Sequence, residues 1–387
     1  MIVAGVMSGT SADGINVALV RLMGRGFRTR LELLAHDEYP FPANVRRTVL
    51  SMMNATVSVA DMTRMNFLLG ELYAEAVNET CRRASLKADL VGCHGQTIYH
   101  QGEAANYLGR KIACTWQTGE GSIIAARCGV PAVTDFRPAD MANGGKGAPL
   151  VPFLDYVLFR HPRRGRIVQN IGGIGNLTSI PPKAAPEQVS AFDTGPGNMV
   201  IDQVMDRFFG KRYDKDGQVA SRGKVLDTVV SELLRANFFH RKPPKTAGRE
   251  EFGREFVTEF LRKCRRARNE DIVATATSLT ARSIAEAVRS LLPATQQDGQ
   301  RDGKLYHDYI VSGGGAKNRT LMRMIGSELA PWGLKIRTSD DVGLASDAKE
   351  AVAFALLAYE TWRREASNVP SATGAKRPTV LGKISYA

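Results

Sequence analysis

The stretch Ser190-Ala191-Phe192-Asp193-Thr194-Gly195-Pro196-Gly197-Asn198 brings one carboxylate to the start of a glycine-rich turn. Apolar residues lead into it as a buried strand would, and Asp193 follows Phe192 directly. Gly195 and Gly197 permit backbone conformations that are closed to other residues, and they leave room for a ligand to come close. We therefore expect a strand, a turn that approaches a ligand, and an acidic side chain beside that turn.

A helix is predicted to begin at the end of this turn. Asn198 is a residue type that caps helices, and the apolar residues after it share one helical face: Met199, Val200, Ile201, Val204 and Met205. The unpaired N–H groups and partial positive charge of a helix start suit a phosphate. The alternative is a tight strand-to-helix turn in which Asp193 bonds only backbone amides.

Three further glycine loops follow predicted strands. The first spans Ser8 to Gly14 after the strand at 3–6, and the others span 172–175 and 312–318. The pattern of strand, glycine turn and strand begins once at residue 3 and again near residue 167, which indicates two halves of related architecture. Strands alternate with helices in both halves, which is typical of α/β layers. Periodicity predicts helices over 62–83, 251–266, 271–292, 319–329 and 347–362, strands over 31–35, 90–93 and 306–311, and an irregular tail from 367 to 384.

Size and composition set limits on the class of protein. The 387 residues suffice for two domains, and 43% are hydrophobic and 24% charged, as in globular proteins. No apolar run is long enough to span a membrane, and no signal peptide precedes the first strand. The five cysteines are odd in number and form no C-x-x-C pair, so neither a disulfide framework nor a zinc site is indicated. We expect a cytoplasmic protein without a membrane partner.

The net charge of +13 is concentrated in basic clusters at 160–166, 235–245 and 262–268. Such a surface attracts nucleotides or nucleic acid at long range, but these clusters lack the interleaved aromatic residues of a single-strand binding platform. We interpret them as solvated faces and expect no nucleic-acid partner.

Common nucleotide and metal motifs are missing from the sequence. No Gly-Lys pair is followed by Ser or Thr, and neither 173–175 nor 313–315 completes G-x-G-x-x-G, which argues against P-loop enzymes and Rossmann dehydrogenases. His94 and His100 stand six residues apart without an obvious third ligand, so we expect no metal site there.

Seven segments, taken together and in order, resemble the anhydro-N-acetylmuramic acid kinase family. They are 5–14 (GVMSGTSADG), 93–97 (CHGQT), 134–137 (TDFR), 147–152 (GAPLVP), 170–176 (NIGGIGN), 192–198 (FDTGPGN) and 312–318 (SGGGAKN). The resemblance spans nearly the whole chain. It implies an α/β fold of two lobes with actin and sugar-kinase topology, similar to ribonuclease H, and ATP in the cleft between them. The lobes are expected at 1–160 and 161–387, with the last helix packing back on the first lobe.

The resemblance also implies a set of nucleotide contacts, with Mg²⁺ accompanying ATP. A first phosphate loop comprises Gly9, Thr10, Ser11, Ala12, Asp13, Gly14 and Asn16; a second region comprises Gly172, Gly173, Gly195, Gly197 and Asn198; and Gly313, Gly314, Gly315 and Lys317 lie beside the adenosine. Few protein ligands are expected for Mg²⁺, because it borrows nucleotide oxygens and keeps its waters; Asp13 is the candidate, acting through water. The family usually has Asp where this chain has Asn16, which keeps an oxygen but loses the charge.

The reaction implied by the resemblance opens an internally bridged sugar, 1,6-anhydro-N-acetylmuramic acid, recovered from peptidoglycan turnover. Water attacks the anomeric carbon and the freed 6-oxygen takes the γ-phosphoryl group, giving N-acetylmuramic acid 6-phosphate and ADP. The family assigns activation of the water to the carboxylate that matches Asp193. This agrees with the physical chemistry, because water is a poor nucleophile at neutral pH and gains from a positioned base.

Sugar contacts are expected from Thr97, Arg137, Asp140 and Glu350. Arg137 suits the lactyl carboxylate, although a structural ion pair with Asp135 or Asp140 is an alternative, and Glu350 has the alternative of an ordinary exposed helix residue. Two rival functions stay open: a levoglucosan kinase, and a non-catalytic nucleotide- or nucleic-acid-binding protein. The family also suggests a homodimer.

Overall fold

A computed structural model describes residues 1–9, 11–243, 245–299 and 304–387. The chain folds into two compact units: Met1–Leu158 with Ala348–Ala387, called unit 1, and Phe159–Asp347, called unit 2. The boundary near 158 lies close to the expected one at 160. The segment from 348 onward, however, belongs to unit 1, although it was expected in the second lobe with only its last helix packing back on the first.

Unit 1 is built from strands and helices of the first half and the C-terminal segment. Its strands are β1 (Ile2–Ser8), β2 (Gly14–Met23), β3 (Arg30–Pro40), β4 (Leu90–Tyr107), β5 (Arg110–Thr118), β6 (Ala132–Thr134) and β12 (Lys383–Ser385). Its helices are α1 (Ala43–Met52), α2 (Val59–Ala84), α3 (Gly121–Cys128), α4 (Phe136–Ala142), α5 (Pro152–Phe159), α14 (Lys349–Trp362) and α15 (Pro370–Thr373).

The strand order in unit 1 is β12-β6-β4-β1-β2-β3, with β5 paired to β4. Strands β1, β2 and β3 form an antiparallel meander, in which Val6 pairs with Val17. Strands β4 and β6 continue the sheet on the other side of β1 and run parallel to it. The strand expected over 31–35 is therefore confirmed, and it is longer in the structure, where it forms β3.

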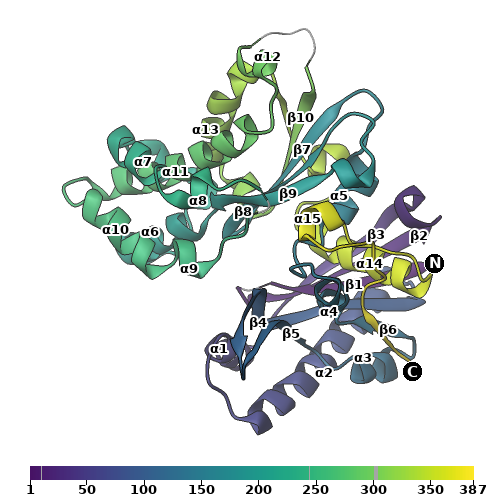
Figure 1. Ribbon diagram of the computed structural model, residues 1–387. Coiled ribbons are helices and arrows are strands. Elements are labelled where there is room, and N and C mark those ends of the chain that lie inside the picture. Colours follow the sequence, from purple (N-terminus) through teal and green to yellow (C-terminus); the bar gives the residue numbers. More distant parts are fainter. Residues whose placement is uncertain (10, 244, 300–303) are drawn as a thin grey trace. The chain divides into compact units, whose positions relative to one another are not determined.

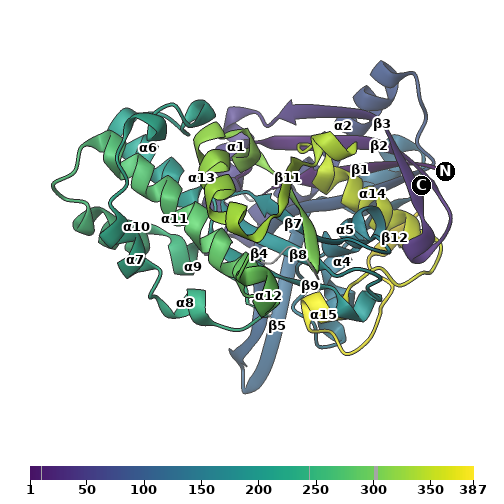
Figure 2. The same cartoon turned by 90° about the horizontal axis from the view of Figure 1, so that it is seen from above.

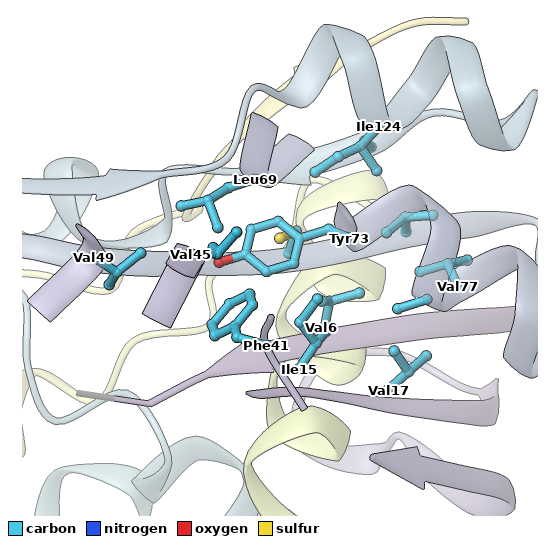
Figure 3. Packing of buried hydrophobic residues seen from close by; sticks show 14 of the residues in the cluster. Val6, Ile15, Val17, Phe41, Val45, Val49, Leu69, Tyr73, Val77 and Ile124 are labelled. Carbon is cyan, nitrogen blue, oxygen red and sulfur yellow. The ribbon is translucent and has the colours of Figure 1, made fainter. Parts of the chain in front are cut away.

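The two faces of this sheet are covered by different helices (Figure 1). On one face, Val6 and Val17 belong to the same hydrophobic cluster as the fully buried Tyr73 of α2. Figure 3 shows these side chains between β1, β2 and α2. On the other face, a Cβ at Gly5 would collide with the backbone oxygen of Ala351, so α14 lies directly on the strand backbone. Alternation along β1 explains both contacts, because successive residues of a strand point to opposite faces.

Unit 2 contains the second set of strands and helices. Its strands are β7 (Gly165–Ile171), β8 (Ile174–Ile180), β9 (Ser190–Pro196), β10 (Tyr306–Ser312) and β11 (Lys335–Thr338). Its helices are α6 (Met199–Phe209), α7 (Asp227–Leu233), α8 (Asn237–His240), α9 (Arg249–Phe252), α10 (Arg254–Lys263), α11 (Asn269–Arg289), α12 (Ala294–Gln297) and α13 (Arg319–Leu329).

The sheet of unit 2 has the order β11-β10-β7-β8-β9 and repeats the plan of unit 1. Strands β7, β8 and β9 form an antiparallel meander, and β10 and β11 run parallel to β7 on its other side. The first strand of each meander is central in both sheets, so the prediction of two related α/β halves is confirmed. Helices α11 and α13 pack side by side against this sheet (Figure 2).

Three local predictions differ from the structure. The strand predicted over 90–93 continues as β4 to Tyr107, because its polar second half pairs with β5. The helix predicted over 251–266 is divided at Gly253 into α9 and α10. The tail predicted as irregular contains the short helix α15 and the strand β12, which pairs with β6.

Candidate active site

The glycine turns of unit 2 meet at one end of its sheet. Gly172 and Gly173 connect β7 to β8, and their carbonyls accept hydrogen bonds of 2.7 and 2.9 Å from the amides of Asn198 and Gly197. A Cβ at Gly197 would overlap the Gly172 oxygen, so only glycine permits this approach. The second phosphate region predicted from sequence is therefore one bonded cluster of two turns.

The start of α6 differs from the expected anion site. Asn198 does not cap the helix with its side chain, which instead donates to the Ile171 carbonyl at 3.4 Å. The amides of Gly197, Asn198 and Met199 all donate to the carbonyls of Gly172 or Gly173. The prediction that these N–H groups are unpaired and available to a phosphate is therefore wrong, because the neighbouring hairpin uses them.

The loop after β10 joins the same cluster. Gly313 has a φ of 84°, and a Cβ there would meet Asn170 Oδ1 at 2.5 Å and the Ile171 oxygen at 2.8 Å. Gly314 faces the side-chain nitrogen Nδ2 of Asn198, and Gly315 packs against the Ile171 side chain. Lys317, by contrast, is exposed and pairs with Asp347 at 2.7 Å. The three predicted loops of unit 2 thus lie together at the ends of β7, β9 and β10.

Asp193 lies on β9 two residues before Gly195, at the edge of this cluster. Its side chain is half-buried, and Oδ2 accepts a 2.7 Å hydrogen bond from the amide of Ala247. Burial raises the pKa of Asp193 to about 7, although the Ala247 amide and the charge of Lys245 act to lower it. A carboxylate whose pKa is close to neutral is suited to accept a proton at physiological pH.

Lys245 supports this carboxylate from the segment that follows α8. Its carbonyl accepts a 3.0 Å hydrogen bond from the Asp193 amide, and its ammonium donates to the carbonyls of Phe238 and Phe239. The ammonium also lies 4.7 Å from the ring centroid of Phe238. Neither Lys245 nor Ala247 was predicted, because a basic cluster in the sequence gives no indication that it pairs with a strand 54 residues away.

In unit 1, the first predicted phosphate loop connects β1 to β2. Ala12 has a φ of 49° and is fully buried, and its amide donates to the Gly9 carbonyl, which closes the turn. Buried Gln96 holds this loop by donating to the same Gly9 carbonyl at 3.1 Å and accepting from Ser8 at 2.6 Å. Ser11 and Gly14 lie in the described loop, whereas Thr10 lies outside the described residues.

The carboxylate of Asp13 is half-exposed and forms an ion pair of 3.2 Å with Arg46 of α1. The oxygen of Asn16 is 3.0 Å from His36 Nε2 on the neighbouring strand β3. Arg46 was not expected in this loop, because it comes close only through packing of α1.

Arg137 lies at the start of α4 and contacts His94, which follows the buried strand segment at 90–93. The Nη2 and Nε atoms of Arg137 lie 2.7 and 3.2 Å from His94 Nε2, and Nη1 donates to the Gly147 carbonyl at 2.8 Å. Burial and the Arg137 charge lower the pKa of His94 well below its usual value. Burial also lowers the pKa of Arg137, to about 10, so the guanidinium stays charged at neutral pH.

Asp140 is a structural residue in this fold. Its side chain is fully buried, and its oxygens accept hydrogen bonds from the Gly147 amide, Asn368 Nδ2 and Thr373 Oγ1 at 2.9, 2.7 and 2.7 Å. The predicted sugar contact is not compatible with this burial. Asp140 instead fastens the loop of 140–147 to the C-terminal segment, which the sequence places more than 220 residues away.

The other two predicted sugar contacts belong to the same unit. Thr97 on β4 is half-buried, and its hydroxyl accepts from Gln117 Nε2 at 3.3 Å. Glu350 at the start of α14 reaches solvent at its surface, but the protein packed around its carboxyl desolvates it and raises its pKa, while the charges of Lys349 and Arg137 act in the opposite direction. Arg137 and Glu350 thus interact electrostatically, although 213 positions separate them in the sequence.

Within the described residues, no group of three or more His, Cys, Asp or Glu side chains is arranged to hold a metal ion. In the same part of the chain, no helix combines the length and apolar character needed to cross a membrane. Two basic clusters have partners: Arg164 and Arg166 pair with buried Asp308, and Arg262, Lys263 and Arg268 pair with nearby acidic residues.

Two α/β units with the same sheet plan, and glycine turns gathered at strand ends beside a carboxylate, are the features of the fold class of actin and the sugar kinases. A profile of anhydro-N-acetylmuramic acid kinase matches residues 1–387. The chain therefore belongs to the anhydro-N-acetylmuramic acid kinase family.

Relatives with this name agree with the assignment. The protein of Caldanaerobacter subterraneus subsp. tengcongensis is 46% identical over 393 aligned positions, which cover 99% of this chain and 96% of that protein. The protein of Bacillus cereus strain G9842 is 44% identical and covers 100% of this chain and 99% of the relative.

Solved structures give a weaker likeness. An activator of 2-hydroxyisocaproyl-CoA dehydratase from Clostridium difficile with bound ADPNP aligns with a TM-score of 0.45 at 12% identity, covering 94% of this chain and 96% of that one. A ROK family glucokinase from Streptomyces griseus aligns with a TM-score of 0.39 at 12% identity, covering 93% and 100%. Likeness at this level adds nothing to the family assignment.

Proposed function

We propose that this protein converts 1,6-anhydro-N-acetylmuramic acid, ATP and water into N-acetylmuramic acid 6-phosphate and ADP, as a step of peptidoglycan recycling in the cytoplasm. Membership of the family makes the chain a kinase, a phosphotransferase with an alcohol group as acceptor. The proposal rests above all on Asp193, whose pKa of about 7 makes it a competent base beside the glycine turns.

Asp193 acts on the water in this mechanism. Oδ2 is held by the Ala247 amide, and we assign the proton of the attacking water to Oδ1. The water oxygen bonds to the anomeric carbon while the bond from that carbon to the bridging 6-oxygen breaks. The 6-oxygen then takes the γ-phosphoryl group, and ADP leaves. A positioned carboxylate base contributes roughly 10²–10⁴ to the rate of such a step.

The glycine turns of unit 2 and the loop at 9–14 are the candidate phosphate contacts. At Gly172, Gly173 and Gly314 the nearest atom to an added Cβ is 3.7, 3.6 and 3.7 Å away, so the backbone at these positions has room for contact with a phosphate. Mg²⁺ accompanies the nucleotide and neutralises charge on its phosphates. Asp13 is the one carboxylate in the described part of that loop and fits a role through bound water, because Mg²⁺ usually keeps several waters.

Arg137 is the candidate contact for the lactyl carboxylate of the substrate. A guanidinium binds a carboxylate through two parallel hydrogen bonds, which fixes its orientation as well as its charge. Thr97 and Glu350 are candidates for the sugar hydroxyls. A homodimer remains a prediction from the family.

The decisive experiment measures ADP release with Mg·ATP and 1,6-anhydro-N-acetylmuramic acid, together with the mass of the sugar product. The wild type is expected to form a product heavier by one water and one phosphoryl unit, and Asp193→Asn is expected to lose this activity. Asp206→Asn, an exposed carboxylate on α6, is the matched control and keeps it. If the wild type turns over levoglucosan but not 1,6-anhydro-N-acetylmuramic acid, the proposed substrate is wrong. If it turns over neither sugar, the proposed kinase activity is wrong.

A further inference from the structure

The imidazole of His94 is nearly fully buried and contacts groups on three sides. Its Nδ1 lies 2.7 Å from the carbonyl of Gly95, and its ring centroid lies 4.6 Å from that of Phe354 on α14. Because a carbonyl only accepts hydrogen bonds, Nδ1 carries the proton in this tautomer. Nε2 is then a bare acceptor and faces the guanidinium of Arg137.

The guanidinium of Arg137 is fixed on two of its edges. His94 Nε2 receives the Nε and Nη2 side of the fork, and the Gly147 carbonyl receives Nη1. An arginine has five N–H groups, so these contacts leave two of them for another partner. Two is the number that a carboxylate takes in a bidentate pair.

We infer that His94 is a positioning residue: its Nε2 orients Arg137 so that the remaining N–H groups of the guanidinium receive the carboxylate of the substrate. This inference rests on the proposed function. It adds His94 to the residues that determine substrate binding, although His94 does not touch the sugar and acts only through Arg137. A neutral imidazole suits the role, because a charged one would repel the guanidinium and offer it no lone pair.

The position explains why histidine rather than another acceptor stands here. A carboxylate at 94 would form a full ion pair with Arg137 and compete with the substrate carboxylate for the same charge. A neutral acceptor aligns the guanidinium without adding a negative charge to those of Glu350 and Asp140, so the guanidinium still attracts an anion. His94 therefore orients the guanidinium of Arg137 without neutralising its charge.

The test compares His94→Leu and His94→Gln on two sugars. Leucine keeps the apolar contact with Phe354 but removes the acceptor, whereas glutamine restores an acceptor oxygen near the position of Nε2. With His94→Leu, KM for 1,6-anhydro-N-acetylmuramic acid is expected to rise roughly 10- to 100-fold, the effect of one hydrogen bond to a charged group. The kcat should change less, and His94→Gln should restore most of the affinity.

Levoglucosan provides the internal control, because it has no lactyl carboxylate for Arg137 to bind. Its turnover by the wild type is expected to be weak, and its KM should be the same in His94→Leu as in the wild type. His100→Leu, on the same strand but exposed, is the matched control and should leave both sugars unaffected. An equal rise in KM for both sugars, or a loss of kcat alone, would overturn the inference.

A measurement without substrate separates this inference from the proposed function. In ¹⁵N-labelled protein, the Nε–H signal of Arg137, assigned with Arg137→Lys, should be protected from hydrogen exchange in the wild type and in His94→Gln. It should exchange at least tenfold faster in His94→Leu, with thermal unfolding confirming that the variant is folded. Equal protection in all three proteins would refute the role of His94, even if the enzyme proved to act on another sugar.

Discussion

The backbone amide of Ala247 donates a 2.7 Å hydrogen bond to Oδ2 of Asp193, from a segment 54 residues further along the chain. The carbonyl of Lys245 accepts from the Asp193 amide in the same segment. The segment therefore behaves as an extra partner to the edge strand β9 and fixes both the backbone and the carboxylate of Asp193. One oxygen of the candidate base is held in place while the other stays available for chemistry.

The rate is expected to depend on pH through Asp193. Because burial raises its pKa to about 7, the carboxyl is protonated and inactive as a base below that value. The kcat/KM should rise with pH through about 7 and level off above it, since this ratio reports groups of the free enzyme. A profile measured between pH 5 and 9 with saturating Mg·ATP tests this. A flat profile across pH 6 to 8 would contradict it.

The same raised pKa predicts that Asp193→Asn stabilises the protein. In the unfolded chain an Asp titrates near 3.9, so the folded state binds a proton that the unfolded state does not, over the range of about pH 4 to 7. Stability is therefore lost as pH rises through that window, and a neutral amide avoids this loss. Asp193→Asn should melt at a higher temperature than the wild type at pH 8, and the difference should shrink at pH 5.

Lys245→Met should move the pH profile to higher pH. The ammonium of Lys245 lowers the pKa of Asp193, so its removal lets that pKa rise further. Methionine keeps the contact with the Phe238 ring, which limits the structural change. Lys242→Met is the control from the same segment, because its side chain is exposed. An unchanged profile in Lys245→Met would show that the charge has no part in tuning the base.

Gly197→Ala should disrupt the cluster of glycine turns. The added methyl group would overlap the carbonyl oxygen of Gly172, and overpacking of this kind costs about 1–3 kcal/mol. We expect a lower melting temperature and weaker ATP binding by calorimetry. At Gly326 on α13, outside the candidate phosphate contacts, the nearest atom to an added Cβ is 3.6 Å away, so Gly326→Ala should be tolerated. Equal behaviour of the two variants would refute the packing argument.

Asp140→Ala should affect stability far more than substrate affinity. It leaves the buried donors of Gly147, Asn368 and Thr373 without their acceptor, at about 1–3 kcal/mol for each unpaired group. Denaturant unfolding measures the loss, with Asp135→Asn as a partly exposed control on the same segment. If the Asp140→Ala protein keeps its stability and only its KM for the sugar rises, Asp140 contacts the sugar after all, contrary to what its burial indicates.

Much of the candidate site could be read from local sequence. Nearby residues are sufficient to predict four features: the strand β1, the glycine loop after it, the helix α13, and the position of Asp193 on a strand before a turn. These features depend on hydrophobic periodicity and on the backbone freedom of glycine, which act within a few residues. The resemblance to the kinase family rests on the same short segments.

Long-range contacts could not be read in this way. The amides at the start of α6 look free in sequence, and only the 172–173 hairpin shows that they are taken. The strand β4 continues through polar residues because β5 supplies its hydrogen bonds. His94 and Gln96 stand out in sequence only as part of segment 93–97, and Arg46 has no local signal; the contacts of these residues with Arg137, Gly9 and Asp13 arise from packing between elements.

The sequence by itself determined many of the elements, the order of the glycine loops and the family, because these follow from short stretches of neighbouring residues. Only the tertiary structure decided that Asp140 fastens the C-terminal segment, that residues 348–387 belong to unit 1, and that Ala247 holds Asp193. The physical reason is that burial and hydrogen-bond partners belong to pairs of segments far apart in the chain. Which donor meets which acceptor is set when the sheets and helices pack.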